Sequence, residues 1–211
     1  MKHVRRVYLY SRFERFWHWT QALLILGLGV TGFEVHGTYT LLGFQRAYMW
    51  HVRLGWALVA LIIFAAFWHF TTGQWKQYIP TFERVGVMLR YYTQGMFRNE
   101  PHPYKKSEIS KLNPLQRLTY LGFKILIAPI FVTTGLLMVY ADRWAEWGIP
   151  WSLRSVATVH IIAAFLMLMF FIVHIYMTTT GRTIFANIKA MLVGYEEIPW
   201  DTAEEGGQAG V

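Results

Sequence analysis

The chain has 211 residues, of which 55% are hydrophobic and 18% aromatic, and its mean hydropathy is positive. This composition excludes an ordinary soluble domain and predicts an integral membrane protein built as a single helical bundle. The absence of cysteine excludes disulfides, cysteine-ligated iron–sulfur clusters and covalently attached c-type haem. The net charge of +8 does not indicate nucleic acid binding, because the basic loops of a membrane protein account for it.

The first apolar segment covers about residues 16–35 and follows a basic N-terminus. A basic start before an apolar run is also typical of a signal peptide, but this run is close to full spanning length and no small-x-small cleavage site follows it. We therefore expect it to be retained as the first membrane span. After a short loop, the second span is expected at about residues 50–71, because about 20 apolar residues can cross a bilayer.

The connection at about residues 72–117 is the longest and the most basic. Within it, residues 79–97 carry apolar side chains at helical spacing behind Pro80, which predicts an amphipathic helix lying at the membrane interface. The third span is expected at about residues 118–140 and the fourth at about residues 156–179.

The predicted fold is all-α: an integral membrane four-helix bundle with the interfacial helix between the second and third spans. It occupies residues 1–195 as one domain, and residues 196–211 are expected to form an acidic, flexible tail. Basic residues gather at the N-terminus and in the long connection, and positively charged loops stay in the cytoplasm. Four spans bring both ends to one side. We therefore predict a bacterial inner membrane protein with cytoplasmic termini.

Two histidines interrupt the fourth apolar segment, His160 and His174. Their separation of fourteen residues is about 40° short of four helical turns and about 21 Å along the helix axis. Both imidazoles therefore point from one face of the helix, one near each side of the membrane. An ionisable side chain inside a span is costly, and its default interpretation is functional.

Depth pairs these two residues with histidines of other spans. His18 lies on the cytoplasmic side of the first span and pairs with His174, whereas His51 opens the second span on the outer side and pairs with His160. Because two imidazoles from different helices at one level can ligate a haem iron, we predict two b haems. Zinc is a weaker alternative, since two ligands per level leave a tetrahedral site incomplete. His69 also lies at cytoplasmic depth and is the alternative to His18 as the ligand facing His174.

Several short motifs support this interpretation: R-x-x-H-W at residues 15–19, H-x-x-x-G at residues 51–55, Thr134-Gly135, and the His160/His174 spacing followed by Ile-Tyr-Met. With them, about residues 10–195 resemble the di-haem cytochrome b subunits that anchor respiratory formate dehydrogenases, thiosulfate reductases and nickel–iron hydrogenases. The resemblance implies the same iron ligands as the depth argument, namely His18, His51, His160 and His174.

The resemblance also implies a menaquinone or ubiquinone site beside the cytoplasmic-side haem. Its polar residues correspond to Asn113 and Gln116. The chain differs from the family pattern between these two positions, where Pro114-Leu115 stands in place of an expected glycine.

Haem propionates are anions and favour nearby arginine or lysine. Arg53 and Arg154 flank the outer haem level. Lys124 lies inside the third span at the inner level, where it either snorkels to the interface, neutralises a propionate or contacts a quinone.

Together these features predict the membrane-anchor cytochrome b subunit of a respiratory oxidoreductase complex, which carries electrons between a periplasmic partner and the membrane quinone pool. The resemblance and the lack of cysteine assign iron–sulfur or multihaem electron transfer, and substrate catalysis, to partner subunits. The direction of electron flow stays open, as does whether the chain itself counts as an enzyme. Two alternatives are a freestanding cytochrome b561-type quinone oxidoreductase and a haem-free transporter that uses the histidines as a proton relay.

Overall fold

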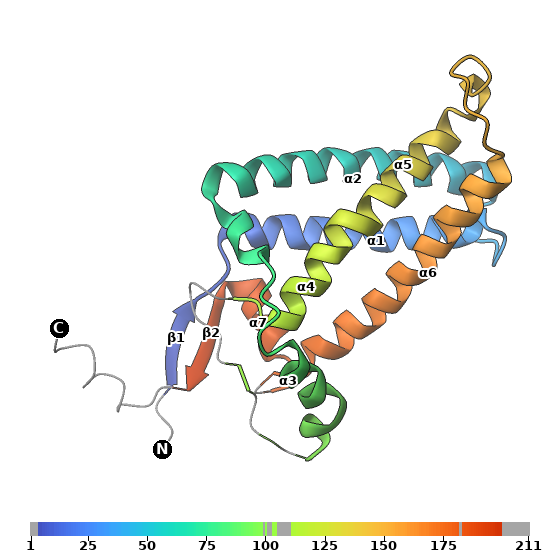
Figure 1. The fold of residues 1–211 in the computed structure, drawn as a ribbon. Helices are drawn as coiled ribbons and strands as arrows, with labels where there is room; N and C mark the ends of the chain where they lie inside the picture. The colour runs from blue at the N-terminus through green and yellow to red at the C-terminus, as the bar shows by residue number, and fades with distance from the viewer. Residues whose placement is uncertain (1–3, 99, 101–102, 105–110, 182, 200–211) are drawn as a thin grey trace.

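The computed structural model describes residues 4–98, 100, 103–104, 111–181 and 183–199 (Figure 1). Among these residues, three stretches are long and apolar enough to cross a membrane: α2 (Phe44–Thr72), the stretch Pro114–Val139, and α6 (Leu153–Thr178). The middle stretch consists of α4 (Pro114–Gly122), a π-helical segment (Phe123–Ile127) and α5 (Ala128–Val139). The second, third and fourth predicted segments are thus confirmed as candidate spans.

The first predicted segment is helix α1 (Arg12–Val35), which lies side by side with α2 (Figure 1). A capping box starts it, because Ser11 Oγ accepts from the Glu14 N–H at 3.2 Å and Glu14 Oε2 accepts from the Ser11 N–H at 2.7 Å. The candidate spans found in the described part of the chain do not include α1, whose first turns carry polar side chains such as His18 and Gln21.

Glu34 holds the loop between α1 and α2 against the end of α1. Its Oε1 accepts hydrogen bonds from the backbone N–H groups of Leu41, Leu42 and Gly43 at 2.6–2.7 Å. A carboxylate in this place also faces the N-terminus of α2, which carries partial positive charge. The end of α1 and the start of α2 are therefore fixed relative to each other at the loop that joins them.

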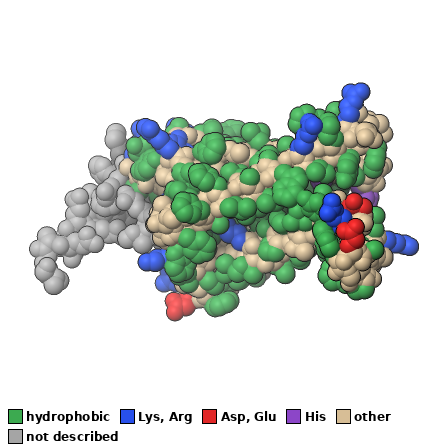
Figure 2. All heavy atoms as spheres, turned by 90° about the horizontal axis from the view of Figure 1, so that it is seen from above, with side chains coloured by type: hydrophobic (Ala, Val, Ile, Leu, Met, Phe, Trp, Pro, Cys, Tyr) green, Lys and Arg blue, Asp and Glu red, His purple; other side chains and the backbone are tan. Residues whose placement is uncertain are grey.

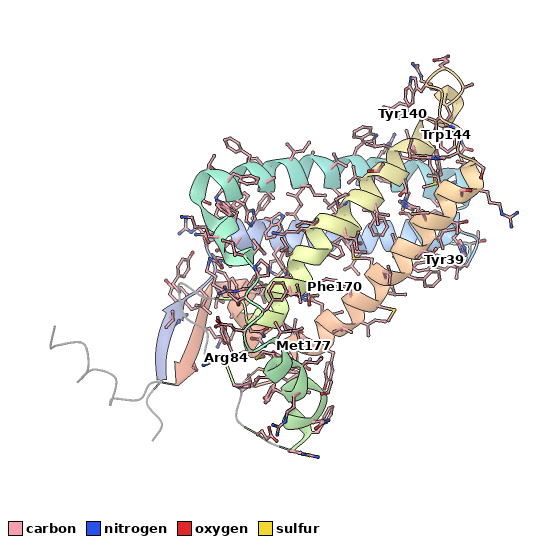
Figure 3. All side chains as sticks on the ribbon, in the orientation of Figure 1. Tyr39, Arg84, Tyr140, Trp144, Phe170 and Met177 are labelled. Carbon is pink, nitrogen blue, oxygen red and sulfur yellow. The ribbon has the colours of Figure 1, made fainter. Side chains whose placement is uncertain are left out.

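Helices α5 and α6 form a second packed pair, which crosses α1 and α2 obliquely (Figure 1). Trp144 in the loop between them folds back, and its Nε1 donates to the Leu137 carbonyl at 2.9 Å. The end of the molecule with the two short loops carries Tyr39, Tyr140 and Trp144, whereas Arg84 lies at the opposite end (Figure 3).

A small antiparallel sheet departs from the predicted all-α fold. It lies at the end of the molecule opposite the two short loops. Strand β1 (Val4–Tyr8) pairs with β2 (Tyr195–Pro199), with Tyr8 opposite Tyr195 and their ring centroids 4.9 Å apart. Residues 196–199 were predicted to belong to the flexible tail, because a pairing between the two ends of the chain leaves no local pattern in the sequence. Residues 200–211 of that tail lie outside the described residues.

Gly194 links α7 (Ala186–Val193) to β2 in a conformation that only glycine adopts easily, with φ of 90°. Its carbonyl accepts from the N–H groups of Leu9 at 2.9 Å and Tyr10 at 3.2 Å, and a Cβ here would lie 2.8 Å from the Tyr10 carbonyl oxygen. We expect Gly194→Ala to lower the free energy of unfolding by roughly 1–3 kcal/mol, measured by thermal denaturation in detergent. Gly37→Ala is the control, because Gly37 has φ of 86° but no atom within 4 Å of a Cβ. Equal losses in the two variants would contradict the close contact.

The long connection contains a shorter helix than predicted. Helix α3 (Val85–Arg90) begins five residues after Pro80 and continues into a π-helical segment (Tyr91–Gly95) and a 3-10 helix (Met96–Arg98). The helical run therefore starts later than predicted and reaches the predicted end. The connection is tied to the start of α1 by an ion pair in which Lys111 Nζ lies 2.8 Å from Glu14 Oε1. These two side chains are only 12% and 14% exposed, so the pair fixes the connection beside the first turn of α1.

Large apolar side chains are exposed along the helices rather than collected in a core. Figure 2 shows one face of the molecule covered mostly by hydrophobic side chains. Exposed apolar surface of this extent marks contact with lipid or with another protein. Examples on the candidate spans are Ile63, Phe67, Ile125, Met169 and Ile172.

Candidate functional site

Four histidines meet in two pairs, each between different helices. His51 of α2 faces His160 of α6, with ring centroids 6.2 Å apart and ring planes at 76°. His18 of α1 faces His174 of α6, with ring centroids also 6.2 Å apart and ring planes at 46°. The structure therefore brings together the same pairs that depth in the sequence predicts.

The spacing in both pairs fits a metal ion held between two imidazoles. A metal–imidazole bond of about 2 Å places the centroids of two opposed rings about 6 Å apart. The angle between the ring planes is free in this geometry, since both planes contain the nitrogen–metal–nitrogen axis. Within the described residues, no group of three or more His, Asp or Glu side chains could hold a metal ion. Two protein ligands at each depth suit haem, because its iron takes six ligands and the porphyrin would supply the other four.

Two buried threonines orient the first pair. Thr31 of α1 lies with its Oγ1 3.1 Å from His51 Nδ1, and Thr134 of α5 lies with its Oγ1 2.8 Å from His160 Nδ1. Each hydroxyl donates its hydrogen to the carbonyl four residues earlier, Gly27 at 2.7 Å and Ile130 at 2.6 Å. The hydroxyl oxygen is therefore left to accept from the imidazole Nδ1–H, which leaves the lone pair of Nε2 available to a metal ion.

A glycine follows each of these threonines and faces the same imidazole. A Cβ at Gly32 would lie 2.9 Å from His51 Cε1, closer than an ordinary contact. A Cβ at Gly135 would lie 3.7 Å from His160 Cε1, an ordinary contact distance. The α1 backbone therefore approaches its imidazole more closely than the α5 backbone does.

The second pair has a different environment. The Nδ1 atom of His18 is buried and has no hydrogen-bond partner among the described residues. His174 stacks on Phe170 at a centroid distance of 5.8 Å and contacts Tyr120 at 6.5 Å. Aromatic rings therefore flank the imidazole of His174, and Phe170 lies midway along the bundle in Figure 3.

A family model described as prokaryotic cytochrome b561 matches residues 9–194. The chain belongs to this family. It is 30% identical over 210 residues to "Putative cytochrome YdhU" of Escherichia coli (strain K12), across 92% of this chain and 76% of that protein. It is 26% identical over 196 residues to "Probable Ni/Fe-hydrogenase B-type cytochrome subunit" of Rhodobacter capsulatus, across 81% and 72%. No solved structure matches the chain.

Membership confirms the resemblance to membrane-anchored cytochromes b. The chain is a membrane cytochrome b that transports electrons, and haem b is the cofactor implied by its family. The two imidazole pairs fit this cofactor, because each places two imidazole rings from different helices at a centroid spacing that one iron between them requires.

His69 of this cytochrome is buried, and both of its ring nitrogens have partners. Its Nδ1 lies 2.6 Å from the Ala65 carbonyl oxygen, so it donates there, and Nε2 then accepts from the Tyr78 hydroxyl at 3.3 Å. The ring also meets the edge of Trp17, the residue before His18, at 5.1 Å. These contacts favour His18 over His69 as the residue facing His174.

Lys124 lies in the π-helical segment of the third span and folds over aromatic rings. Its Nζ is 3.2 Å from the centroid of the Tyr78 ring and 5.3 Å from that of Trp17. Such cation–π contacts stabilise an ammonium group in a weakly hydrated place. Tyr78 also bonds His69, and the His69 ring contacts Trp17, so Lys124, Tyr78, His69 and Trp17 form one cluster of contacts.

Asn113 and Gln116 form the capping box that starts α4. Asn113 Oδ1 accepts from the Gln116 N–H at 2.9 Å, and Gln116 Oε1 accepts from the Asn113 N–H at 3.1 Å. Pro114 fits the first position of the helix, where no N–H is needed. Asn113 Nδ2 also donates to the Tyr92 hydroxyl at 3.0 Å, and burial raises the pKa of Tyr92 to about 12. The two predicted quinone residues thus have a clear structural role, and a quinone contact stays a prediction.

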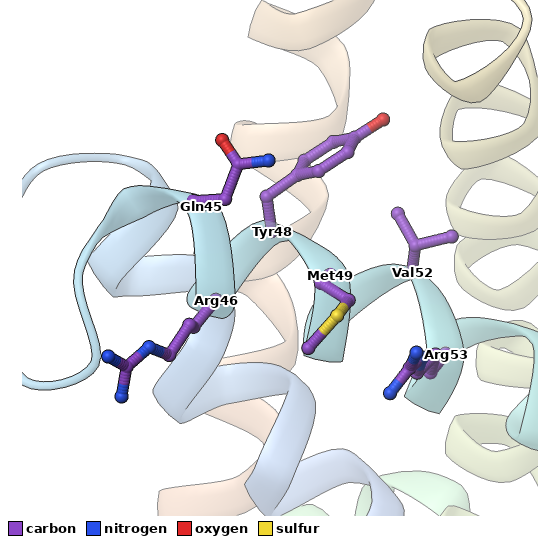
Figure 4. Close-up of a pocket in the computed structure, with 6 residues that line it drawn as sticks. All are labelled: Gln45, Arg46, Tyr48, Met49, Val52 and Arg53. Atoms are coloured by element: carbon purple, nitrogen blue, oxygen red, sulfur yellow. The ribbon is translucent and has the colours of Figure 1, made fainter.

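Arg53 and Arg154 lie at the end of the bundle with the first pair, but away from its imidazoles. At about 100° per residue, Arg53 is about 200° around α2 from His51, and Arg154 is about 240° around α6 from His160. Both side chains are exposed. Arg53 stacks over Trp50 at 5.5 Å and lines a surface pocket with Gln45, Arg46, Tyr48, Met49 and Val52 (Figure 4). A propionate contact for either arginine stays a prediction.

Thr31 and Tyr78 contact histidines of the site but were not predicted from the sequence. Thr31-Gly32 repeats the dipeptide Thr134-Gly135, and each dipeptide precedes a histidine of the next helix, by 20 and 26 residues from threonine to histidine. This repetition was a signal in the sequence. Tyr78 left no such signal, since it reaches His69 through a turn behind Gly73.

Proposed function

We propose that this cytochrome is a four-span, di-haem subunit that carries electrons between a redox protein on the outer face of the bacterial cytoplasmic membrane and the quinone pool. The equal spacing of 6.2 Å in two imidazole pairs carries the proposal. His18 and His174 would hold one haem b, and His51 and His160 the other. When bound, haem iron takes up and releases single electrons.

A fourth span is part of the proposal, because α1 supplies His18. The partner of His18 is His174, which lies within the candidate span α6. A helix of 24 residues is about 36 Å long, enough for a hydrocarbon core of about 30 Å. The polar side chains in its first turns then face the bundle, and exposed Leu23 and Leu26 face lipid.

The proposed orientation follows from the distribution of basic residues. Lysine and arginine are frequent in residues 1–15 and 72–117 and sparse in the two short loops, so the end with β1, β2 and α3 would face the cytoplasm. The pair of His18 and His174 then lies near the cytoplasmic side. The pair of His51 and His160 lies near the outer side, about 21 Å away along α6.

The partners are proposed from chemistry and from a relative. The chain has no cysteine, so an iron–sulfur cluster that exchanges electrons with it would belong to another subunit. The relative named "Probable Ni/Fe-hydrogenase B-type cytochrome subunit" supports association with catalytic subunits in a complex. We propose that an iron–sulfur or multihaem subunit of this complex lies on the periplasmic face. Menaquinone or ubiquinone would bind near the second pair, where Lys124, Asn113 and Gln116 are its candidate contacts.

A reduced-minus-oxidised spectrum of the purified chain, with haem content by the pyridine haemochrome method, tests the proposal. We expect α bands of b-type haem and two haems per chain. A chain without such bands would agree instead with a proton-coupled transporter. One haem per chain in fully loaded protein would contradict the di-haem arrangement.

A freestanding quinone oxidoreductase is the second candidate, because the family is described as cytochrome b561. Purification from its native membrane in mild detergent distinguishes the two. Co-purification of an iron–sulfur or multihaem protein in fixed ratio is expected for the anchor subunit. A di-haem protein that purifies alone and still reduces quinone would identify the freestanding enzyme.

A further inference from the structure

Threonine hydroxyls contact only one of the two imidazole pairs in the hydrogen bonds of the described residues. Thr31 bonds His51 between α1 and α2, and Thr134 bonds His160 between α5 and α6. Both threonines are buried, 5% and 8% exposed. The same unit, a threonine on one helix and a histidine on its packed neighbour, thus occurs once in each helix pair.

The two hydroxyls act on the imidazoles in one direction. Each gives its own hydrogen to a backbone carbonyl and so accepts from Nδ1–H, at 3.1 Å from His51 and 2.8 Å from His160. An acceptor on Nδ1–H fixes the tautomer and the ring orientation, and it makes Nε2 a more basic ligand. A more basic ligand stabilises oxidised iron more than reduced iron, which lowers the reduction potential. In a buried place this polarisation is not screened by water.

We propose that Thr31 and Thr134 are positioning residues that lower the midpoint potential of the haem held by His51 and His160. The inference rests on the ligation proposed above. It does not extend to the other haem, because His18 Nδ1 has no hydrogen-bond partner among the described residues. The two threonines therefore separate the potentials of two haems that have the same kind of ligands.

The test is a spectroelectrochemical redox titration of the purified di-haem chain and its hydroxyl-free variants. In Thr31→Val and Thr134→Val, we expect one of the two components to shift to higher potential, with a larger shift in the double variant. The other component stays unchanged. Thr→Ser at either position keeps the hydroxyl and is expected to keep the wild-type potential. If a valine variant does not retain haem, the Thr→Ala variant at the same position is measured instead.

Thr133→Val is the matched control, because Thr133 neighbours Thr134 on α5 but is exposed. It is expected to leave both potentials unchanged. Hydroxyl-free variants with two haems and wild-type potentials would overturn the inference, as would an equal shift in Thr133→Val.

A wrong assignment of the haem ligands would give a different experimental result. If the component that shifts in Thr31→Val persists in His51→Ala, the assignment of ligands is wrong. If that component is lost in His51→Ala but its potential does not respond to either threonine, only the role of the threonines is wrong.

Discussion

Replacing His18 by alanine is expected to reduce the haem content from two per chain to one, whereas His69→Ala is expected to leave both haems in place. The reason is geometric. The His18 ring lies 6.2 Å from that of His174, at the spacing of two ligands on one metal ion. His69 instead uses its two nitrogens on the Ala65 carbonyl and the Tyr78 hydroxyl. Haem content by pyridine haemochrome, with the low-temperature α band, measures the result.

The double variant His18→Ala/His174→Ala tests whether these residues hold the same haem. It is expected to lose one haem, like each single variant, because the effects of substitutions at two residues that hold the same haem are not additive. His69→Gln is a milder companion of His69→Ala, since loss of a buried hydrogen bond costs about 1–3 kcal/mol in stability. His36→Ala is the control at an exposed histidine. If His69→Gln and His69→Ala both lose the haem that His174→Ala loses, the assignment of His18 is wrong.

Gly32→Val is expected to weaken binding of the haem held by His51 and His160. Even the first added carbon would lie 2.9 Å from His51 Cε1 and 3.3 Å from its Nδ1. The imidazole has little freedom to retreat, because Thr31 holds its Nδ1 at 3.1 Å. Overpacking of this kind costs about 1–3 kcal/mol, which corresponds to a loss of roughly five- to 150-fold in haem affinity. Gly32→Ala should show the smaller part of this loss, measured by haem retention during dilution or apo-myoglobin competition.

Two glycines nearby supply controls for the size of the added group. A Cβ at Gly135 would lie 3.7 Å from His160 Cε1, so Gly135→Ala is expected to keep both haems. A Cβ at Gly29 would meet no atom within 4 Å, so Gly29→Val is expected to do the same. Equal haem loss in Gly29→Val and Gly32→Val would point to a general weakness of α1 rather than to contact with His51.

Much of the site could be predicted from one helix. The apolar length of α6 indicates a span, and the interval of fourteen residues places His160 and His174 on one face at two depths. The same reasoning assigns depths to His18 and His51. Charge and hydropathy also predicted α2, the stretch Pro114–Val139 and α6 as spans. These features follow from helical periodicity and bilayer thickness, which are local properties of the sequence.

Other predictions could not separate two roles of the same residue. The pattern around Asn113 and Gln116 suggested a quinone site, but an N-cap residue three positions before a Gln also forms a capping box that starts a helix, and here it does. Arg53 and Arg154 are near the first pair along the chain, but a helix turns about 100° per residue and directs both to its other side. Nearness in sequence does not establish nearness in space.

The sequence by itself predicted four spans, of which three are candidate spans in the described part of the chain, and it determined the family to which the chain belongs. It also predicted two levels for the histidines. Tertiary structure decided that His18 rather than His69 faces His174, that Thr31 and Thr134 bond the other pair, and that the two ends of the chain meet in a sheet. The physical reason is that periodicity states the direction of a side chain only relative to its own helix. The rotation of each helix against its neighbours, and pairing between distant strands, arise from packing of the whole chain.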